Sequence, residues 1–179
     1  MKKTLQFFPQ YAPEPYNLPA HGWNVEKSRF PLSFAPSIPY KGLDDIRFLP
    51  GFYNNQSGDF WSYCYLWYLD GNVNFTESQV KTDLLAYYNG LNQTQDATVS
   101  VKKVAAASGY DATFECTINT IDKFVTHKPI TLNATVNIKR CAEDDKTMVF
   151  FEISPQPFTG DTWQKLHAVR NGLSCRKEE

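Results

Sequence analysis

One uncharged segment marks the centre of the predicted fold: Phe60-Trp61-Ser62-Tyr63-Cys64-Tyr65-Leu66-Trp67-Tyr68-Leu69. Successive side chains of a β-strand point to opposite faces, so the segment divides into two sets. One face receives Trp61, Tyr63, Tyr65, Trp67 and Leu69, and the other receives Phe60, Ser62, Cys64, Leu66 and Tyr68. We therefore predict a strand that is covered on both sides, with a ladder of aromatic rings on one of them.

The aromatic ladder allows two interpretations. Trp61, Tyr63, Tyr65 and Trp67 are candidate ligand-binding residues, because aromatic rings stack on sugars and other flat ligands and Tyr hydroxyls orient them. The alternative is that the same rings pack beneath a helix or beneath the proline-rich N-terminal part of the chain. We favour packing, because an uncovered patch of this size would act as an interface or aggregation site.

Composition limits the class of protein. A chain of 179 residues fits one domain, for which we expect an extended arm over residues 1–20 and a globular core over residues 21–175. The content of 42% hydrophobic and 21% charged residues excludes wholesale disorder. The net charge is −1 and no basic stripe is visible, so we expect no nucleic-acid partner. No run approaches the roughly 20 apolar residues that span a bilayer.

The N-terminus leaves the location open. Met1-Lys2-Lys3-Thr4 is similar to the start of a secretory signal, but the apolar stretch that follows ends at Pro9 and is too short. Either the chain is cytoplasmic, or a signal peptide has been removed and the protein is periplasmic or secreted.

The four cysteines form no C-x-x-C pair, which argues against a zinc knuckle or a thioredoxin motif. Cys64 and Cys116 lie within apolar strand patterns and are expected to be small core residues. Cys141 and Cys175 are able to pair if the compartment is oxidising.

Residues 1–50 hold 8 of the 11 prolines, which predicts an irregular N-terminal lobe because proline lacks a backbone donor. Residues 41–48 fit either one helical turn or a short strand. Asp44 is interpreted as a turn or cap residue, and Asp144-Asp145 as the tip of a hairpin.

Two helices are predicted. Thr76-Glu77-Ser78-Gln79 matches a capping box, in which Thr76 accepts from the backbone and Gln79 reaches back. It starts a helix over residues 77–89 that Gly90 ends. A second helix over residues 161–172 carries apolar residues on one side, among them Trp163.

Two further segments, residues 112–119 and 132–139, alternate apolar and polar residues as antiparallel strands do. Residues 97–104 are also predicted to form a strand, and residues 148–153 to complete a hairpin with residues 132–139. The alternation predicts that helices pack one face of the sheet and that the other face is largely polar. The predicted fold class is α+β, an antiparallel sheet packed by two helices in a layered α/β sandwich, with the proline-rich N-terminal lobe beside it.

Two resemblances accompany this prediction. Gly22-Trp23, residues 30–36 (FPLSFAP) and residues 46–52 (IRFLPGF), followed by the aromatic segment, resemble a group of exported bacterial proteins of unknown function over about residues 20–92. The order of elements, with the ending from Trp163 to Leu173-Ser174-Cys175, resembles Mog1/PsbP-like domains in outline. The second resemblance implies an accessory or binding module rather than an enzyme.

Catalytic and metal-binding patterns are missing from the sequence. His21, His127 and His167 lie far apart in the chain and match no H-E-x-x-H or H-x-H pattern, so we assign no metal, no cofactor and no catalytic residue. His167 is interpreted as a partly buried structural group, and the other two as loop residues.

These observations lead to a non-catalytic binding or accessory module outside the cytoplasm, with an unknown protein or small molecule as its partner. The alternative is a hydrolase-like enzyme whose site lies beside the aromatic strand. In a third hypothesis, the proline-rich arm over residues 7–20 docks on another protein.

Overall fold

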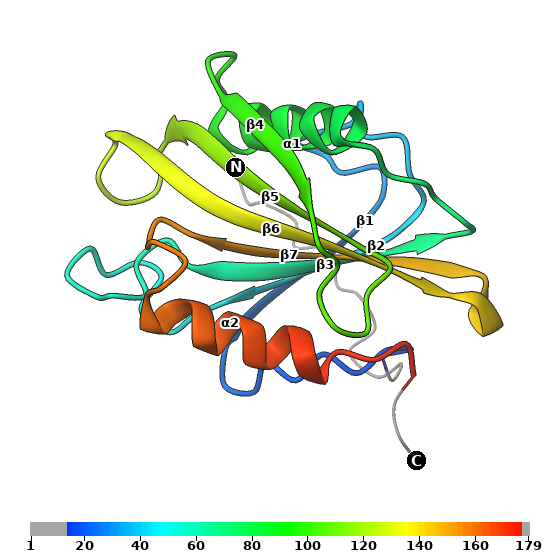
Figure 1. The fold of residues 1–179 in the computed structure, drawn as a ribbon. Helices are drawn as coiled ribbons and strands as arrows, with labels where there is room; N and C mark the ends of the chain where they lie inside the picture. Colours follow the sequence, from blue (N-terminus) through cyan, green and yellow to red (C-terminus); the bar gives the residue numbers. More distant parts are fainter. Residues whose placement is uncertain (1–13, 177–179) are drawn as a thin grey trace, which may run out of the picture.

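A single antiparallel sheet of seven strands, in the order β1-β2-β3-β7-β6-β5-β4, organises the computed structural model, which describes residues 14–176 (Figure 1). The strands are β1 (Asn24–Arg29), β2 (Gly42–Phe48), β3 (Tyr63–Asp70), β4 (Thr98–Val104), β5 (Ala112–Ile121), β6 (Pro129–Cys141) and β7 (Lys146–Ser154). A short 3-10 turn, η1 (Ala142–Asp144), joins β6 to β7 at the predicted hairpin tip. The fold is α+β, as predicted, and it forms one domain.

The aromatic strand lies inside the sheet. β3 pairs with β2 on one side and with β7 on the other, so both of its edges are hydrogen-bonded. It starts at Tyr63, later than predicted, because Trp61 adopts a left-handed backbone (φ 54°) that breaks the extended run. From Tyr63 to Leu69 every side chain is buried, as expected for a strand covered on both faces.

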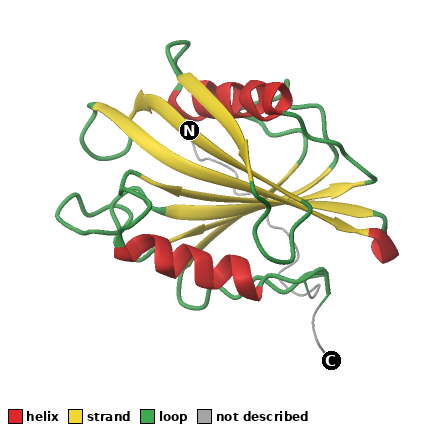
Figure 2. Ribbon diagram, viewed as in Figure 1, coloured by secondary structure: helices red, strands yellow, loops and turns green. Residues whose placement is uncertain are grey.

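The two helices cover opposite faces of the sheet, which corrects the prediction of one packed and one polar face. α1 (Glu77–Asn92) lies on one face and α2 (Asp161–Gly172) on the other (Figure 2). The α1 face is mostly apolar, with Trp67 and Phe151 among its buried residues. The α2 face is apolar only over β3 and β7, where Leu66 and Phe150 pack beneath α2. Neither described helix has the length and apolarity needed to cross a bilayer.

The start of α1 agrees with half of the predicted capping box. The Thr76 hydroxyl accepts from the backbone N–H of Gln79 at 3.1 Å, but the Gln79 side chain donates to Asp83 at 2.9 Å instead of reaching back. The helix also continues past Gly90 to Asn92. Gly90 serves a close approach rather than a stop, because a Cβ there would lie 1.9 Å from the backbone oxygen of Phe34.

The proline-rich region contributes two strands to the sheet. Residues 41–48, left open between a helical turn and a strand, form β2. Asp44 was wrongly interpreted as a turn or cap residue: it lies within β2 and is completely buried. Asp44 is buried because of tertiary packing: β1 and β3 flank β2, and the Asp44 side chain points into the α1 face.

Residues 14–20 of the predicted arm lie against the α2 face, where Tyr16 and Leu18 are buried. The Tyr16 hydroxyl donates to Asp45 at 2.7 Å, and the guanidinium of Arg47 binds the same carboxylate at 2.6 and 2.9 Å. Asn17 forms a β-bridge with Ser174. This part of the arm is therefore attached to the domain by both apolar and ionic contacts. Residues 1–13, including the first half of the segment proposed to dock on a partner, lie outside the described residues.

Candidate functional site

The four candidate binding residues divide into two pairs. Tyr65 and Trp67 are covered completely, and the ring of Tyr65 is stacked between Tyr87 (centroids 4.8 Å apart) and Phe151 (4.2 Å). Trp61 and Tyr63 are also buried, but their rings line a pocket at the end of the ladder. Tyr65 and Trp67 therefore pack under α1, whereas Trp61 and Tyr63 lie beside a pocket that a ligand can enter.

This pocket, called here the aromatic pocket, has a volume of about 180 Å³. Eight of its lining residues are aromatic and surround one space: Phe34, Phe48, Phe52, Tyr53, Trp61, Tyr63, Tyr87 and Phe124. Tyr53 and Phe124 are two of the few large apolar side chains on the surface, with 54% and 45% of their area exposed. Convergent aromatic side chains around a concave space are typical of a small-ligand site.

The loop between β2 and β3 supplies one wall of the pocket. Its backbone is tied back on itself: the N–H of Phe52 donates to Leu49 at 2.9 Å, and the N–H of Trp61 donates to Phe52 at 3.1 Å. Trp61 adopts its left-handed backbone inside this loop, a conformation that costs roughly 1–3 kcal/mol for a residue other than glycine. Strain of this kind persists only where the surroundings hold it, and here it places the indole at the pocket.

The loop between β5 and β6 supplies the opposite wall. Asp122 accepts the backbone N–H groups of Phe124 (2.9 Å), Val125 (3.0 Å) and Thr126 (2.7 Å), together with the Thr126 hydroxyl (2.7 Å). Burial opposes ionisation of this carboxyl, but the contacts with Thr126, Trp61 and Val125 prevail and lower its pKa to about 2. The loop is thus held by an ionised side chain, and it fixes the exposed ring of Phe124 at 5.6 Å from the ring of Trp61.

No sequence pattern predicted that the loop between β5 and β6 forms this second wall. Phe124 comes from a part of the chain that had no predicted strand, and its distance from Trp61 in sequence gives no hint of contact. The one available signal is the order Asp122-x-Phe124, since Asp followed by free backbone donors is typical of a tight turn.

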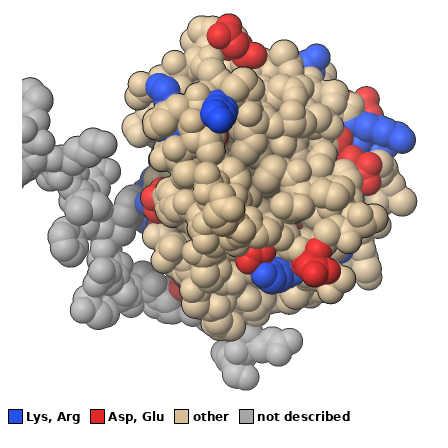
Figure 3. All heavy atoms as spheres, turned by 90° about the vertical axis from the view of Figure 1, so that its left-hand side faces the viewer, with Lys and Arg blue, Asp and Glu red and all other residues tan. Residues whose placement is uncertain are grey.

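Glu26 on the edge strand β1 is the acidic member of the lining, and no Lys or Arg within residues 14–176 lines the pocket. Burial raises the pKa of Tyr53, and the nearby charge of Glu26 raises it further. The loops of the aromatic pocket lie at the end of the molecule that Figure 3 shows, where charged side chains stand toward the margins of a largely uncharged surface.

A second group of polar residues lies on the α2 face. The buried carboxylate of Glu152 contacts Nδ1 of His167 at 2.6 Å and receives an N–H from Arg170 at 3.4 Å and from Asn137 at 3.1 Å. A carboxylate that orients a histidine is also found in hydrolases. Within residues 14–176, however, the contacts of His167 are with Glu152 and the ring of Trp163, and neither supplies a nucleophile.

The other side chains that could act as a nucleophile, base or metal ligand do not lie together. Burial, followed by the charge of Glu152, raises the pKa of the Cys64 thiol well above its ordinary value, so the thiol stays protonated. His21 and His127 are exposed in loops. Among the described residues, no three His, Cys, Asp or Glu side chains come together as metal ligands do.

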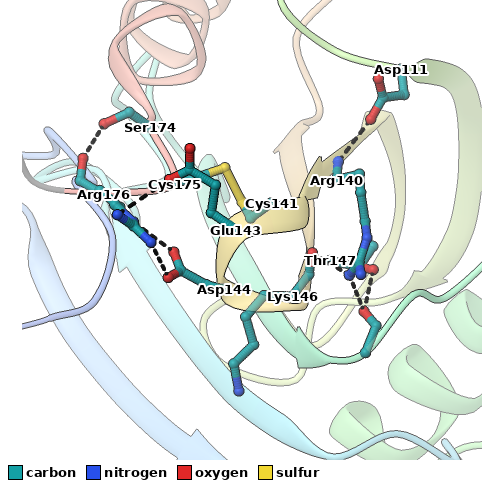
Figure 4. The surroundings of a disulfide bond; sticks show 11 residues. Asp111, Arg140, Cys141, Glu143, Asp144, Lys146, Thr147, Ser174, Cys175 and Arg176 are labelled. Carbon is teal, nitrogen blue, oxygen red and sulfur yellow. Dashed lines mark hydrogen bonds and ion pairs between the residues drawn. A yellow bond between two sulfur atoms is a disulfide. The ribbon is translucent and has the colours of Figure 1, made fainter.

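Cys141 and Cys175 form a disulfide, while Cys64 and Cys116 are free and buried. The bond joins the end of β6 to the segment after α2, and ion pairs between Arg176 and both Glu143 and Asp144 lie beside it (Figure 4). It therefore anchors the C-terminal segment to the β6–β7 turn.

Comparisons with known proteins add no assignment. No family model matches the chain, and neither curated proteins nor solved structures give a match. The function is therefore argued from the geometry of the chain itself.

Proposed function

We propose that this protein is a non-catalytic binding module that works outside the cytoplasm and holds a small ligand, or the head of a larger one, in the aromatic pocket. The observation that carries the proposal is the enclosure of one space by eight aromatic rings, which come from three loops, the sheet and α1. Its volume of about 180 Å³ lies below the roughly 300–1,000 Å³ of sites that enclose whole drug-sized molecules, so a compact group fits best.

The exposed rings in the walls of the aromatic pocket support a role in ligand binding, beyond packing of the core. A ring that serves only the core is normally covered, whereas Phe124 and Tyr53 are held in place by their loops and still face solvent. Preformed walls reduce the ordering cost of binding. The alternative of a hydrolase has no comparable support, because His167 contacts no hydroxyl or thiol in the described part of the chain.

The disulfide supports a location outside the cytoplasm. Such bonds form and persist in oxidising compartments and are rare in the cytosol. Cys141 and Cys175 are 34 residues apart in sequence and are joined where the chain folds back, while the two core cysteines are kept apart.

Binding is tested by titrating isotope-labelled protein, with its disulfide intact, with benzyl alcohol, choline and dimethylbutanol, and following the amide signals by NMR. We expect at least one probe to shift the signals of Tyr53, Trp61 and Phe124 in a saturable way, and the Phe124→Ala variant to lose this binding. Phe158→Ala is the matched control, since Phe158 is an equally exposed ring that packs on Trp163, away from the pocket. Saturable binding that survives in Phe124→Ala, or no response to any probe, would refute the proposal.

A further inference from the structure

We infer that the aromatic pocket selects an organic cation, an ammonium group that carries alkyl substituents. This inference rests on the proposed function and specifies the chemistry of its ligand. It follows from the sign of the charge at the pocket and from the arrangement of the rings.

The charge at the pocket is negative. Glu26 lines it, and no ion pair or hydrogen bond of the Glu26 side chain is found within residues 14–176. Asp122, whose pKa of about 2 keeps it ionised, lies behind the Trp61 indole. Lys123 of the same loop does not line the pocket; its ammonium donates to the side chain of Gln93 at 3.1 Å. A ligand with a positive charge therefore meets the carboxylate of Glu26, and among the described residues no cation of the lining opposes it.

The rings that line the pocket pack against one another and form a continuous aromatic wall. Neighbouring centroids are 4.8 Å apart for Phe48 and Phe52, 5.4 Å for Phe52 and Trp61, and 5.6 Å for Trp61 and Phe124. A cation is attracted to the face of a ring when it lies within about 6 Å of the centroid, and one group in this space meets that condition for more than one ring. Aromatic cages of this composition are a recurring solution for ammonium ligands that carry methyl groups.

The chemistry of the ammonium group decides which cation fits. An unsubstituted ammonium is a compact, strongly hydrated charge, so transferring it into an apolar pocket costs a large part of its hydration. Alkyl substituents spread the charge and weaken the hydration, and they also fill apolar volume against the rings. The lining provides rings and one carboxylate, which match such a group better than they match an anion or a sugar.

The test compares two probes of the same shape. Choline carries a trimethylammonium group, and dimethylbutanol carries an uncharged carbon in place of the nitrogen. We expect choline to bind roughly tenfold more tightly than dimethylbutanol to the wild-type protein at low salt, as measured by the NMR titration. The preference should fall as salt is raised, because Glu26 is exposed and its field is screened.

The Glu26→Gln variant separates charge from shape. It should weaken choline binding several-fold and leave dimethylbutanol binding unchanged, whereas Glu115→Gln, which removes an exposed carboxylate from β5, should change neither. Equal affinity for the two probes in the wild-type protein would overturn the cation inference while the pocket stands as a binding site. Binding of neither choline, dimethylbutanol nor benzyl alcohol would remove both the inference and the proposed function.

Discussion

The two faces of the sheet are built by different means. The α1 face is largely a layer of aromatic and aliphatic side chains, in which the ring of Tyr65 stacks with three others, those of Tyr63, Tyr87 and Phe151. The α2 face has a narrow apolar centre over β3 and β7. On its two sides lie buried charges, Asp45 with Arg47 on one side and Glu152 with His167 and Arg170 on the other.

The difference teaches how one sheet is stabilised from both sides. The α1 face depends on burial and shape, and its edge opens into the aromatic pocket. The α2 face depends on ionic contacts and on a disulfide that ties down the C-terminal segment. Substitutions on the two faces should therefore differ both in size and in their response to solution conditions.

The largest effect is expected on the α1 face. Trp67→Ala removes a completely buried ring that contacts Phe30, Tyr87 and Phe151, and should lower the free energy of unfolding by about 3–5 kcal/mol in urea denaturation. Leu66→Ala, one residue away on the α2 face, is the matched comparison and should cost less. A smaller loss for Trp67→Ala than for Leu66→Ala would contradict the view that aromatic packing dominates.

The disulfide should account for the next largest effect. Changing Cys141 and Cys175 together to Ser should lower the free energy of unfolding by about 2–4 kcal/mol, because the bond restricts the unfolded chain. Dithiothreitol should destabilise the wild-type protein by a similar amount in thermal or urea unfolding. The double variant is the control: sensitivity to dithiothreitol that persists in it would show that the effect does not come from this bond.

Loss of the buried charge on the α2 face should have an intermediate effect. Glu152→Gln weakens the charged hydrogen bonds to His167 and Arg170, so we expect a loss of about 1–3 kcal/mol in urea unfolding. Glu115→Gln on strand β5 removes the same charge from an exposed site and should stay within about 0.5 kcal/mol of wild type. If the two variants are equally stable, the Glu152 cluster contributes nothing beyond a surface charge.

At about pH 4 the smallest effect is expected at Asp44, and this effect should grow as the pH rises. Burial, with the charges of Asp45 and Glu26, raises the pKa of the Asp44 carboxyl well above its ordinary value, against weaker lowering contacts from Trp67 and Ser28. The folded state then keeps a proton that the unfolded state releases above about pH 4, so wild-type stability falls as the pH rises through that window.

Asp44→Asn removes this titration. The difference in unfolding free energy between the variant and the wild-type protein should therefore shift in favour of the variant with rising pH, by up to about 1.4 kcal/mol per pH unit within the window. Urea denaturation between about pH 4 and 7 measures it. A difference that stays constant over this range would show that Asp44 is ionised in the folded protein.

Local patterns predicted the elements better than their arrangement. The alternation in β5 and β6, the apolar run of β7 and the helical spacing around Trp163 were sufficient to locate these elements. The assignment of Gly90 as a helix stop failed because its role depends on Phe34, which is distant in sequence. The interpretation of Asp44 as a turn or cap residue failed for the same reason. A charged residue is expected at the surface unless the strands around it are known.

The candidate site was predicted in part. The aromatic strand led to Trp61 and Tyr63, which line the pocket, but the same argument also selected Tyr65 and Trp67, which lie in the core. Period-two alternation assigns residues to a face of the sheet, yet it cannot tell which end of that face a helix leaves uncovered.

The sequence by itself determined that a strand with apolar residues on both faces lies at the centre of an antiparallel α+β domain. This is local information, because side-chain alternation and hydrophobicity are properties of consecutive residues. The tertiary structure alone decided that the helices lie on opposite faces, that Glu152 meets His167, and that Phe124 closes a pocket over Trp61. Contacts of this kind depend on how distant segments pack, which no local pattern records.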